Sequence, residues 1–221
     1  YSSDGAMSDK WPPDFDDRFR DDLAHLFEWR RDVRRFLADP VDLDLIEGLL
    51  AQACLSPSVG NSQPWRFVLV EDKAKRAAIR ANFLRENAAA LEDYENERRR
   101  QYTKLKLAGL DKAPVHLAVF ADRSTARGHG LGRRTMPEML EYSAVAAVNT
   151  LWLAARAHGI GVGWVSIIDP QAARETVAVP DDWRLIAYLC IGYPEAPHRE
   201  PELQRAGWQD RGHLKDVLFR R

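Results

Sequence analysis

The stretch Trp29-Arg30-Arg31-Asp32-Val33-Arg34-Arg35-Phe36 is the part of the sequence around which we expect the fold and its site to form. It holds four arginines within six residues, one carboxylate among them and an aromatic residue at each end. Clustered guanidinium groups suit a phosphate, because each can donate two parallel hydrogen bonds to its oxygens. Asp32 either pairs with an arginine, accepts a proton or binds a ligand hydroxyl. The spacing also fits an exposed basic turn with one internal salt bridge.

The composition indicates one soluble globular domain. The 221 residues are 45% hydrophobic and 29% charged, with a net charge of −1, which gives no general attraction to nucleic acid or to an acidic membrane surface. Neither a membrane-spanning apolar run nor a secretory signal is visible. Cys54 and Cys190 are flanked by apolar residues and read as buried thiols. We therefore expect a cytoplasmic protein with no nucleic-acid or membrane partner.

Several kinds of site are not indicated. The six histidines never fall three or four residues apart, and no paired cysteines or acidic cluster accompany them, so we expect no metal. The sequence also lacks the Gly-x-Ser-x-Gly motif of hydrolases and a glycine-rich phosphate loop ending in Lys-Ser or Lys-Thr.

Hydrophobic spacing predicts helices alternating with four short strands. The helix over 136–158 is apolar nearly all round, which indicates burial in a core or a subunit interface. Glycines at 159–163 precede a strand and would let the backbone approach a flat ligand. The expected strands are 65–70 (buried on both faces), 115–121, 164–168 and 185–191, and the helical stretches are 16–29, 40–53, 71–101, 136–158 and 170–177. This pattern predicts an α+β fold in one domain.

Six motifs together resemble the nitroreductase-like flavoprotein superfamily over about residues 29–211. They are Arg30-Arg31-Asp32-Val33-Arg34, Pro57-Ser58-Val59-Gly60 with Gln63-Pro64-Trp65, Leu105-Lys106-Leu107-Ala108-Gly109, Leu151-Trp152-Leu153-Ala154-Ala155-Arg156-Ala157, Gly161-Val162-Gly163-Trp164-Val165-Ser166, and Glu200-Pro201-Glu202-Leu203 with Gly207-Trp208. The superfamily usually has serine where Asp32 stands. Asp32 together with Ser166 resembles the subfamily that fragments reduced FMN.

The resemblance implies a nitroreductase-like α+β fold, with a central, mostly antiparallel mixed sheet flanked by helices. It also implies an intertwined homodimer with flavin sites at its interface. Residues 1–15 would be disordered or derived from a tag. Residues 16–221 would form a single FMN-binding domain, with a lid around 95–112 and a C-terminal arm at 194–221.

The implied reaction consumes its flavin. Reduced FMN and O2 would be the substrates, and fragmentation of the isoalloxazine ring would give 5,6-dimethylbenzimidazole, the lower ligand of vitamin B12, and erythrose 4-phosphate. A separate flavin reductase is a possible source of reducing equivalents. The alternatives are an NAD(P)H-dependent nitroreductase or flavin reductase, and a flavin-binding protein that delivers FMN without chemistry.

The resemblance also assigns the site residues. Asp32 would transfer a proton near the ribityl chain, and Ser166 would hydrogen-bond near the reactive flavin nitrogen. The FMN contacts would come from Arg30, Arg31, Asp32, Val33, Arg34, Ser58, Leu107, Ser166 and Arg211, with the arginines on the phosphate and ring edge, Ser58 facing the flavin and Leu107 in the lid. The chain departs from the family at Asn61, Ser62, Glu138 and Leu140, which alters the expected lining of the site.

Overall fold

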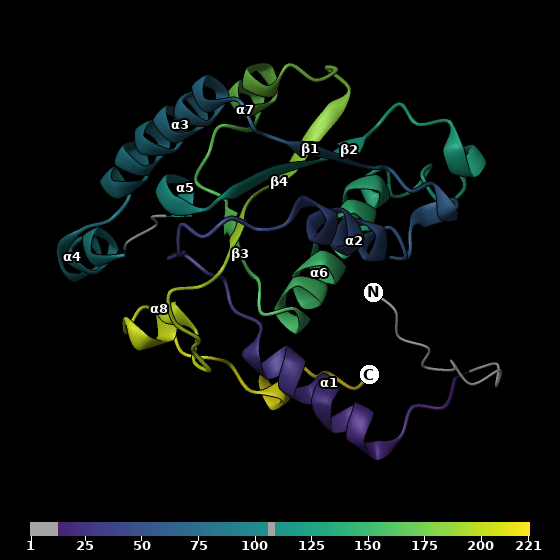
Figure 1. Cartoon of the computed structure of the whole chain (residues 1–221), viewed down its shortest axis with the longest axis horizontal. Helices are drawn as coiled ribbons and strands as arrows, with labels where there is room; N and C mark the ends of the chain where they lie inside the picture. Colours follow the sequence, from purple (N-terminus) through teal and green to yellow (C-terminus); the bar gives the residue numbers. More distant parts are fainter. Residues whose placement is uncertain (1–12, 106–108) are drawn as a thin grey trace.

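The computed structural model describes residues 13–105 and 109–221, and it places a four-stranded sheet between two layers of helices (Figure 1). The helices are α1 (Asp17–Trp29), α2 (Leu43–Ala53), α3 (Lys73–Glu92), α4 (Asn96–Lys104), α5 (Gly109–Lys112), α6 (Met139–Ala157), α7 (Pro170–Val177) and α8 (Glu202–Arg205). The strands are β1 (Trp65–Leu69), β2 (Val115–Asp122), β3 (Gly161–Val165) and β4 (Trp183–Gly192). Short 3-10 turns lie at Val59–Asn61, Arg127–Gly130 and Leu214–Asp216.

The strand order is β1-β2-β4-β3, and neighbouring strands are antiparallel. The segment after α1 adds a parallel bridge between Asp32 and Val162 on β3, and an antiparallel bridge between Phe36 and Pro194. These bridges make the sheet mixed at its β3 edge. The predicted α+β class, with a mostly antiparallel mixed sheet flanked by helices, is confirmed.

The two faces of the sheet carry separate halves of the core. Alternate residues of β2 and β4, such as Leu117 and Leu189, pack with α2 and α6 on one face. Ala118 and Tyr188 point to the other face, where α3, α5 and α7 contribute residues such as Ile79. Because strand side chains alternate between faces, both layers of helices find an apolar surface.

Aspartates define where several helices begin. Side chains of Asp16, Asp42, Asp72 and Asp169 accept hydrogen bonds from backbone N–H groups in the first turns of α1, α2, α3 and α7. These N–H groups have no partner within the helix, so the capping carboxylates stabilise the helix starts. This chemistry is readable from sequence, and the expected helices at these four positions are confirmed.

Two strands differ from the sequence expectation. β1 is not buried on both faces: only Trp65 is buried, and the other four residues are intermediate, because β1 is an edge strand. β3 begins at Gly161 and ends at Val165, so the glycines lie inside the strand rather than before it. Gly163 pairs with Cys190 in the ladder.

Other expectations also change. The polar stretch 71–101 forms two helices, α3 and α4, because the chain turns after Glu92. Cys54 is exposed rather than buried, since it follows the end of α2. The helix expected at 16–29 forms as α1, and every residue of it is at least partly exposed; Phe19 and Phe27 are 43% and 52% exposed. By contrast α6 is embedded in the core, as expected.

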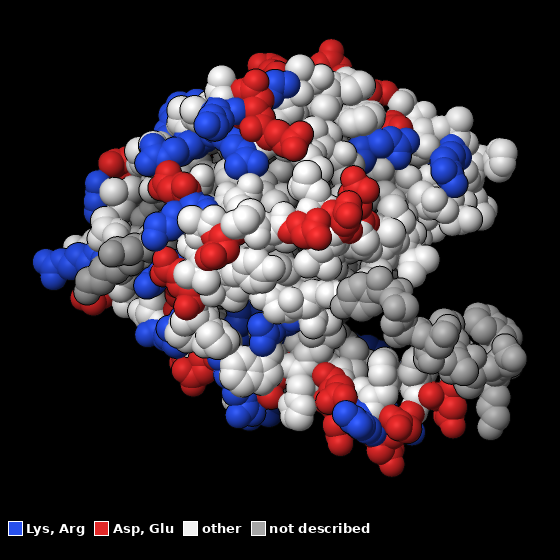
Figure 2. All heavy atoms as spheres, viewed as in Figure 1, with Lys and Arg blue, Asp and Glu red and all other residues white. Residues whose placement is uncertain are grey.

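The surface mixes both signs of charge. Lys and Arg are interspersed with Asp and Glu over the face seen in Figure 2, in keeping with the net charge of −1. Across residues 13–105 and 109–221, no helix is both long and apolar enough to cross a membrane.

Candidate functional site

The arginine-rich segment lies along the free edge of β3. The Val33 N–H donates to the Val162 carbonyl at 3.0 Å, and the Leu37 N–H donates to the Tyr193 carbonyl at 2.8 Å. The backbones approach so closely that a Cβ on Gly163 would lie 2.1 Å from the Val33 carbonyl oxygen. A glycine at position 163 is therefore needed for this contact.

Asp32 uses one carboxylate oxygen to contact β3 and the other to hold Arg34 of its own segment. Oδ1 accepts the Trp164 N–H at 2.9 Å, and Oδ2 accepts the Arg34 Nε–H at 3.1 Å. The Asp32 side chain is 36% exposed, whereas that of Arg34 is 15% exposed. The carboxylate thus has a fixed orientation and still reaches solvent.

The guanidinium group of Arg34 is only partly satisfied. Its Nη1 is buried and has no hydrogen-bond partner among the described residues. A buried N–H donor without an acceptor is costly, and a bound anion would relieve that cost. Arg34 therefore has an N–H donor at Nη1 that could bind a ligand beside Asp32.

Arg30, Arg31 and Arg211 form a second group of positive charges. Burial lowers the pKa of Arg30, and the neighbouring charge of Arg211 lowers it further. The pKa of Arg31 is lowered by burial, by Arg211 and by Arg30. The Arg30 guanidinium also lies 4.9 Å from the centre of the Trp152 ring. Cations that depress one another's pKa favour an anionic ligand.

Two hollows meet at this segment, and Asp32, Val33 and Arg34 line both of them. The first, here the charged hollow, includes Arg31, Arg35, Arg156 and Arg205 as well as carboxylates of the 194–202 stretch. The second, here the aromatic hollow, is lined mainly by apolar and aromatic side chains: Phe83, Tyr102, Leu105, Trp164, Val165, Ser166, Ile167, Cys190, Leu203 and Trp208 among others. Apolar walls with a few polar groups are typical of a small-molecule site.

Tyr94, Tyr102 and Trp208, here called the cover of the aromatic hollow, come from two parts of the chain that are distant in sequence. The rings of Tyr94 and Tyr102 stack at 4.9 Å, and Tyr94 meets Trp208 edge-on at 5.4 Å. Arg98 on α4 lies over the Trp208 ring and donates to the Trp208 carbonyl at 2.9 Å. The expected lid region around α4 and the C-terminal arm therefore contact each other here.

The structure brings together most of the expected site residues. Arg31, Asp32, Val33 and Arg34 line the hollows, Ser166 lines the aromatic hollow, and Arg30 and Arg211 lie beside Arg31. Ser58 lines neither hollow of its own chain; its Oγ accepts the Gln63 N–H at 3.0 Å. Leu107 lies outside the described residues.

The sequence analysis assigned no site role to the aromatic residues, although Trp152, Trp164 and Trp208 lie in the motifs that carry the resemblance. Trp152 donates its Nε1–H to the Arg31 carbonyl at 3.1 Å, and the Trp164 backbone holds Asp32. Tyr102 lies within the expected lid around 95–112, and Trp208 within the expected C-terminal arm. An available signal was the high number of tryptophans, seven in the chain, since tryptophan adjoining arginine favours stacking on a planar or cationic group.

Cys190, which lines the aromatic hollow, carries a thiol that is not reactive at neutral pH. Burial, mainly, raises the pKa of Cys190 to about 12, so the thiol stays protonated at neutral pH and is a poor nucleophile. In the described ranges 13–105 and 109–221, no three His, Cys, Asp or Glu side chains lie close enough to hold a metal ion.

Comparison with known proteins relates this chain to the nitroreductase family and to 5,6-dimethylbenzimidazole synthases. The model of the nitroreductase family matches residues 27–193. The chain is 57% identical over 199 residues to a 5,6-dimethylbenzimidazole synthase of Rhodospirillum rubrum, covering 90% of this chain and 94% of that protein. It is 48% identical over 196 residues to the 5,6-dimethylbenzimidazole synthase of Rhodobacter capsulatus, covering 89% and 95%.

The fold is similar to a solved flavoprotein structure. Oxidised iodotyrosine deiodinase bound to FMN and 3-iodo-L-tyrosine superposes with a TM-score of 0.68 at 28% identity, covering 80% of this chain and 91% of that one.

Proposed function

Because this chain belongs to the nitroreductase family, whose model matches residues 27–193, we propose that it catalyses the 5,6-dimethylbenzimidazole synthase reaction. In this reaction reduced FMN and O2 give 5,6-dimethylbenzimidazole and erythrose 4-phosphate. Support comes from the two synthases at 57% and 48% identity, which align along nearly their whole length.

The observation that carries the proposal is the position of Asp32, Val33 and Arg34 between the two hollows. A ligand with a planar ring and a charged tail fits this arrangement. The ring would occupy the aromatic hollow, and the phosphate would take the donors of Arg30, Arg31, Arg34 and Arg211. The unpartnered Nη1 of Arg34 and the lowered pKa values of Arg30 and Arg31 favour such an anion.

Each site residue then has a stated task. When bound, the reduced flavin supplies the electrons for O2 and the carbon skeleton of the product. Val33 would contact the flavin edge through its position on the β3 border. The Asp32 carboxylate would hold or move a proton at the ribityl chain, and the Ser166 hydroxyl would hydrogen-bond at the ring.

The cover of the aromatic hollow would exclude water from the ring. Tyr102, Leu105 and Trp208, which line the hollow, are suited to this, and we propose that Leu107 belongs to the same cover. Excluding water strengthens the electrostatic contacts inside the site and limits side reactions.

A second subunit would complete the site. Ser58 lines neither hollow of its own chain, so we propose that it reaches the flavin of a partner copy in a homodimer. The exposed apolar residues of α1 support a subunit interface that includes α1.

The test is to incubate the purified protein aerobically with chemically reduced FMN and to separate the products by chromatography. Formation of 5,6-dimethylbenzimidazole with loss of FMN is the expected result. In a parallel incubation with oxidised FMN and NAD(P)H, turnover of NAD(P)H with full recovery of FMN would instead identify a nitroreductase or flavin reductase. Recovery of FMN with neither reaction would identify a protein that only binds flavin.

A further inference from the structure

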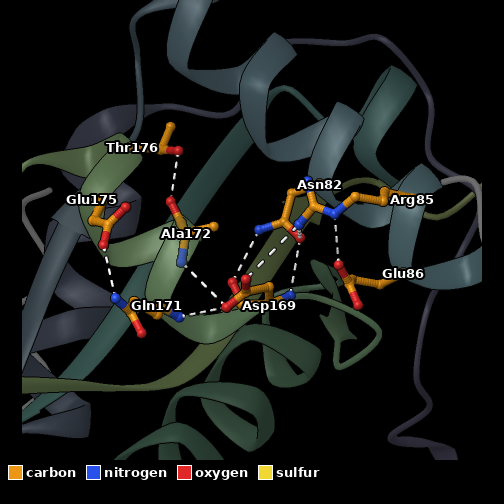
Figure 3. A network of polar contacts seen from close by, with 8 residues as sticks. All are labelled: Asn82, Arg85, Glu86, Asp169, Gln171, Ala172, Glu175 and Thr176. Carbon is orange, nitrogen blue, oxygen red and sulfur yellow. Dashed lines mark hydrogen bonds and ion pairs between the residues drawn. The ribbon is translucent and has the colours of Figure 1, made fainter. Parts of the chain in front are cut away.

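Asn82 on α3 is a buried polar side chain that the proposed chemistry does not use. It is 3% exposed, and its amide closes a ring of two hydrogen bonds with one backbone residue. Its Nδ2 donates to the Asp169 carbonyl at 2.9 Å, and its Oδ1 accepts the Asp169 N–H at 2.9 Å (Figure 3). Oδ1 also accepts a hydrogen bond from Arg85 Nη2 at 3.1 Å. The amide therefore fixes a segment of main chain and links it to Arg85.

The segment that Asn82 fixes contains Ser166. Val165 is held by its pairing with Tyr188 at the end of β3, and Asp169 is held by Asn82. Asp169 also caps α7, because its Oδ1 accepts the N–H groups of Gln171 and Ala172 at 2.9 and 3.2 Å. The span 166–168, whose first two residues line the aromatic hollow, is therefore anchored at both ends.

The same helix also contacts Tyr102, which belongs to the cover of the hollow. The Tyr102 hydroxyl donates to Asn87 Oδ1 at 2.8 Å, and Tyr102 lines the aromatic hollow. Phe83, one helical turn before Asn87, lines the hollow directly. The 20-residue helix α3 thus holds Asp169 at the end of the 166–168 span, lines the hollow through Phe83 and contacts Tyr102.

We propose that Asn82 and Asn87 are positioning residues, which set the separation between the Ser166 wall and the Tyr102 cover. This inference rests on the proposed function. With the separation fixed, the reduced ring is held for fragmentation. With the separation relaxed, O2 takes two electrons and two protons from the reduced flavin and leaves as hydrogen peroxide, and oxidised FMN is recovered intact.

The variant Asn82→Asp tests how the segment 166–169, which includes Ser166, is held. The aspartate side chain has the same shape as asparagine, and one carboxylate oxygen can still accept the Asp169 N–H. The other oxygen would face the Asp169 carbonyl, where no donor remains, so the pairing is broken on one side. The variant Tyr102→Phe tests the cover, because it keeps the ring packing and removes only the hydroxyl that binds Asn87.

The decisive measurement is the ratio of benzimidazole to hydrogen peroxide per O2 consumed. We expect each variant to lower this ratio on the order of 10–100-fold, since a small misplacement in a site can have such an effect, while the affinity for FMN changes little. Hydrogen exchange of the flavin-free protein should also be faster at residues 166–169 in Asn82→Asp. Glu86→Gln is the matched control, because Glu86 lies on α3 at the outer edge of the same network (Figure 3) and contacts Arg85.

The outcomes separate the two claims. If the parent protein makes no benzimidazole, the proposed function fails and the inference fails with it. If the parent makes benzimidazole but both variants keep its product ratio, only the inference is overturned, whatever happens to their thermal stability. An unchanged exchange rate at residues 166–169 in Asn82→Asp would likewise refute the anchoring role of Asn82.

Discussion

At the scale of single residues, Asp32 has two tasks that one substitution can separate. In Asp32→Asn the amide oxygen can still accept the Trp164 N–H, but the amide nitrogen would face Arg34 Nε, where both groups are donors. We expect the variant to fold and to bind reduced FMN. Its yield of benzimidazole should fall by ~10²–10⁴-fold, the usual contribution of a positioned acid or base.

Affinity and yield should be measured on one preparation of Asp32→Asn. Asp122→Asn is a suitable control, because Asp122 also pairs with an arginine, Arg66 at 2.5 Å, but lies outside both hollows. A variant at Asp32 that retains the parent's yield would show that the carboxylate only orients Arg34.

Arg30→Ala should separate the recognition of phosphate from recognition of the ring. The variant should lose ~1.5–3 kcal/mol of FMN binding, as for a charge-assisted hydrogen bond. Riboflavin, which has no phosphate, should bind the parent weakly and lose little. Titration with both flavins measures the difference, with Arg18→Ala as the control because the Arg18 side chain is 89% exposed. Equal losses for the two flavins would exclude the phosphate assignment.

His116 should make the stability of the protein depend on pH. Burial, together with the charge of Arg76, lowers the pKa of His116 from 6.5 to about 4. Below pH 6.5 the unfolded chain binds a proton that the folded chain does not. The free energy of unfolding should therefore be highest above pH 6.5, fall as the pH drops toward 4 and then level off, by on the order of 3 kcal/mol.

Urea unfolding across this pH range measures the effect. His116→Gln can keep a hydrogen bond to the Tyr188 hydroxyl, which lies 3.0 Å from Nδ1, but it does not titrate. This variant should flatten the part of the profile between pH 6.5 and 4, whereas His25→Gln on exposed α1 should not. A parallel profile for the parent and His116→Gln would contradict the assignment.

At the scale of elements, the contact between β3 and the arginine segment depends on Gly163. Gly163→Ala would place a Cβ 2.1 Å from the Val33 carbonyl oxygen. We expect the variant to lose about 1–3 kcal/mol of stability, as for other overpacked sites, and to bind FMN more weakly because the arginines shift. Gly48→Ala is the matched control: nothing lies within 4 Å of its added Cβ, and a helical alanine should add about 0.5–1 kcal/mol. Equal stability of Gly163→Ala and the parent would refute the close approach.

Helices were predictable where local chemistry determines them. Asp42 and Asp169 cap α2 and α7, and the long apolar run of α6 has few alternatives to a central position. Strand limits depend on partners that are distant in sequence. β3 begins at Gly161 because it pairs with Gly192 on β4, and β1 is half-exposed because no strand follows it in the sheet among the described residues. Neither neighbour is visible in local sequence.

At the scale of the whole molecule, the candidate site also combines residues that are grouped in the sequence with residues that only the fold brings together. The arginines and Asp32 are contiguous, so their grouping was evident from the sequence. The aromatic hollow takes Tyr102 from α4, Trp164 from β3 and Trp208 from the C-terminal arm. These residues meet only after the sheet has formed, and aromatic residues at such separations carry no local signal of a shared wall. The family resemblance, rather than spacing, placed Trp164 and Trp208 in motifs of a flavoprotein family.

We also predict that the whole molecule forms a homodimer. Phe19 and Phe27 on α1 are 43% and 52% exposed, and Phe219 in the C-terminal arm is 70% exposed. The C-terminal segment passes close to the end of α1, where Arg199 Nε donates to Glu28 Oε1 at 2.6 Å (Figure 1). Exposed apolar side chains on adjoining elements are typical of a subunit interface.

Sedimentation at micromolar concentration should therefore give twice the mass of the chain. Phe27→Asp should shift the protein toward monomer and keep its secondary structure, because Phe27 is not part of the core, whereas Arg18→Ala should leave the mass unchanged. A parent that sediments as a monomer would rule out the proposed interface and the assignment of Ser58 to a partner's flavin.

The pairing of the arginine segment with β3 also has a consequence for the order of events during synthesis. Asp32 and Trp164 are 132 residues apart, so the arginines leave the ribosome many seconds before their strand partner, at ~5–20 residues per second. Until β3 and β4 emerge, the nascent chain has charges but no pocket. A flavin cannot therefore template the early stages of folding, and ribosome-bound chains halted before β3 should not retain FMN.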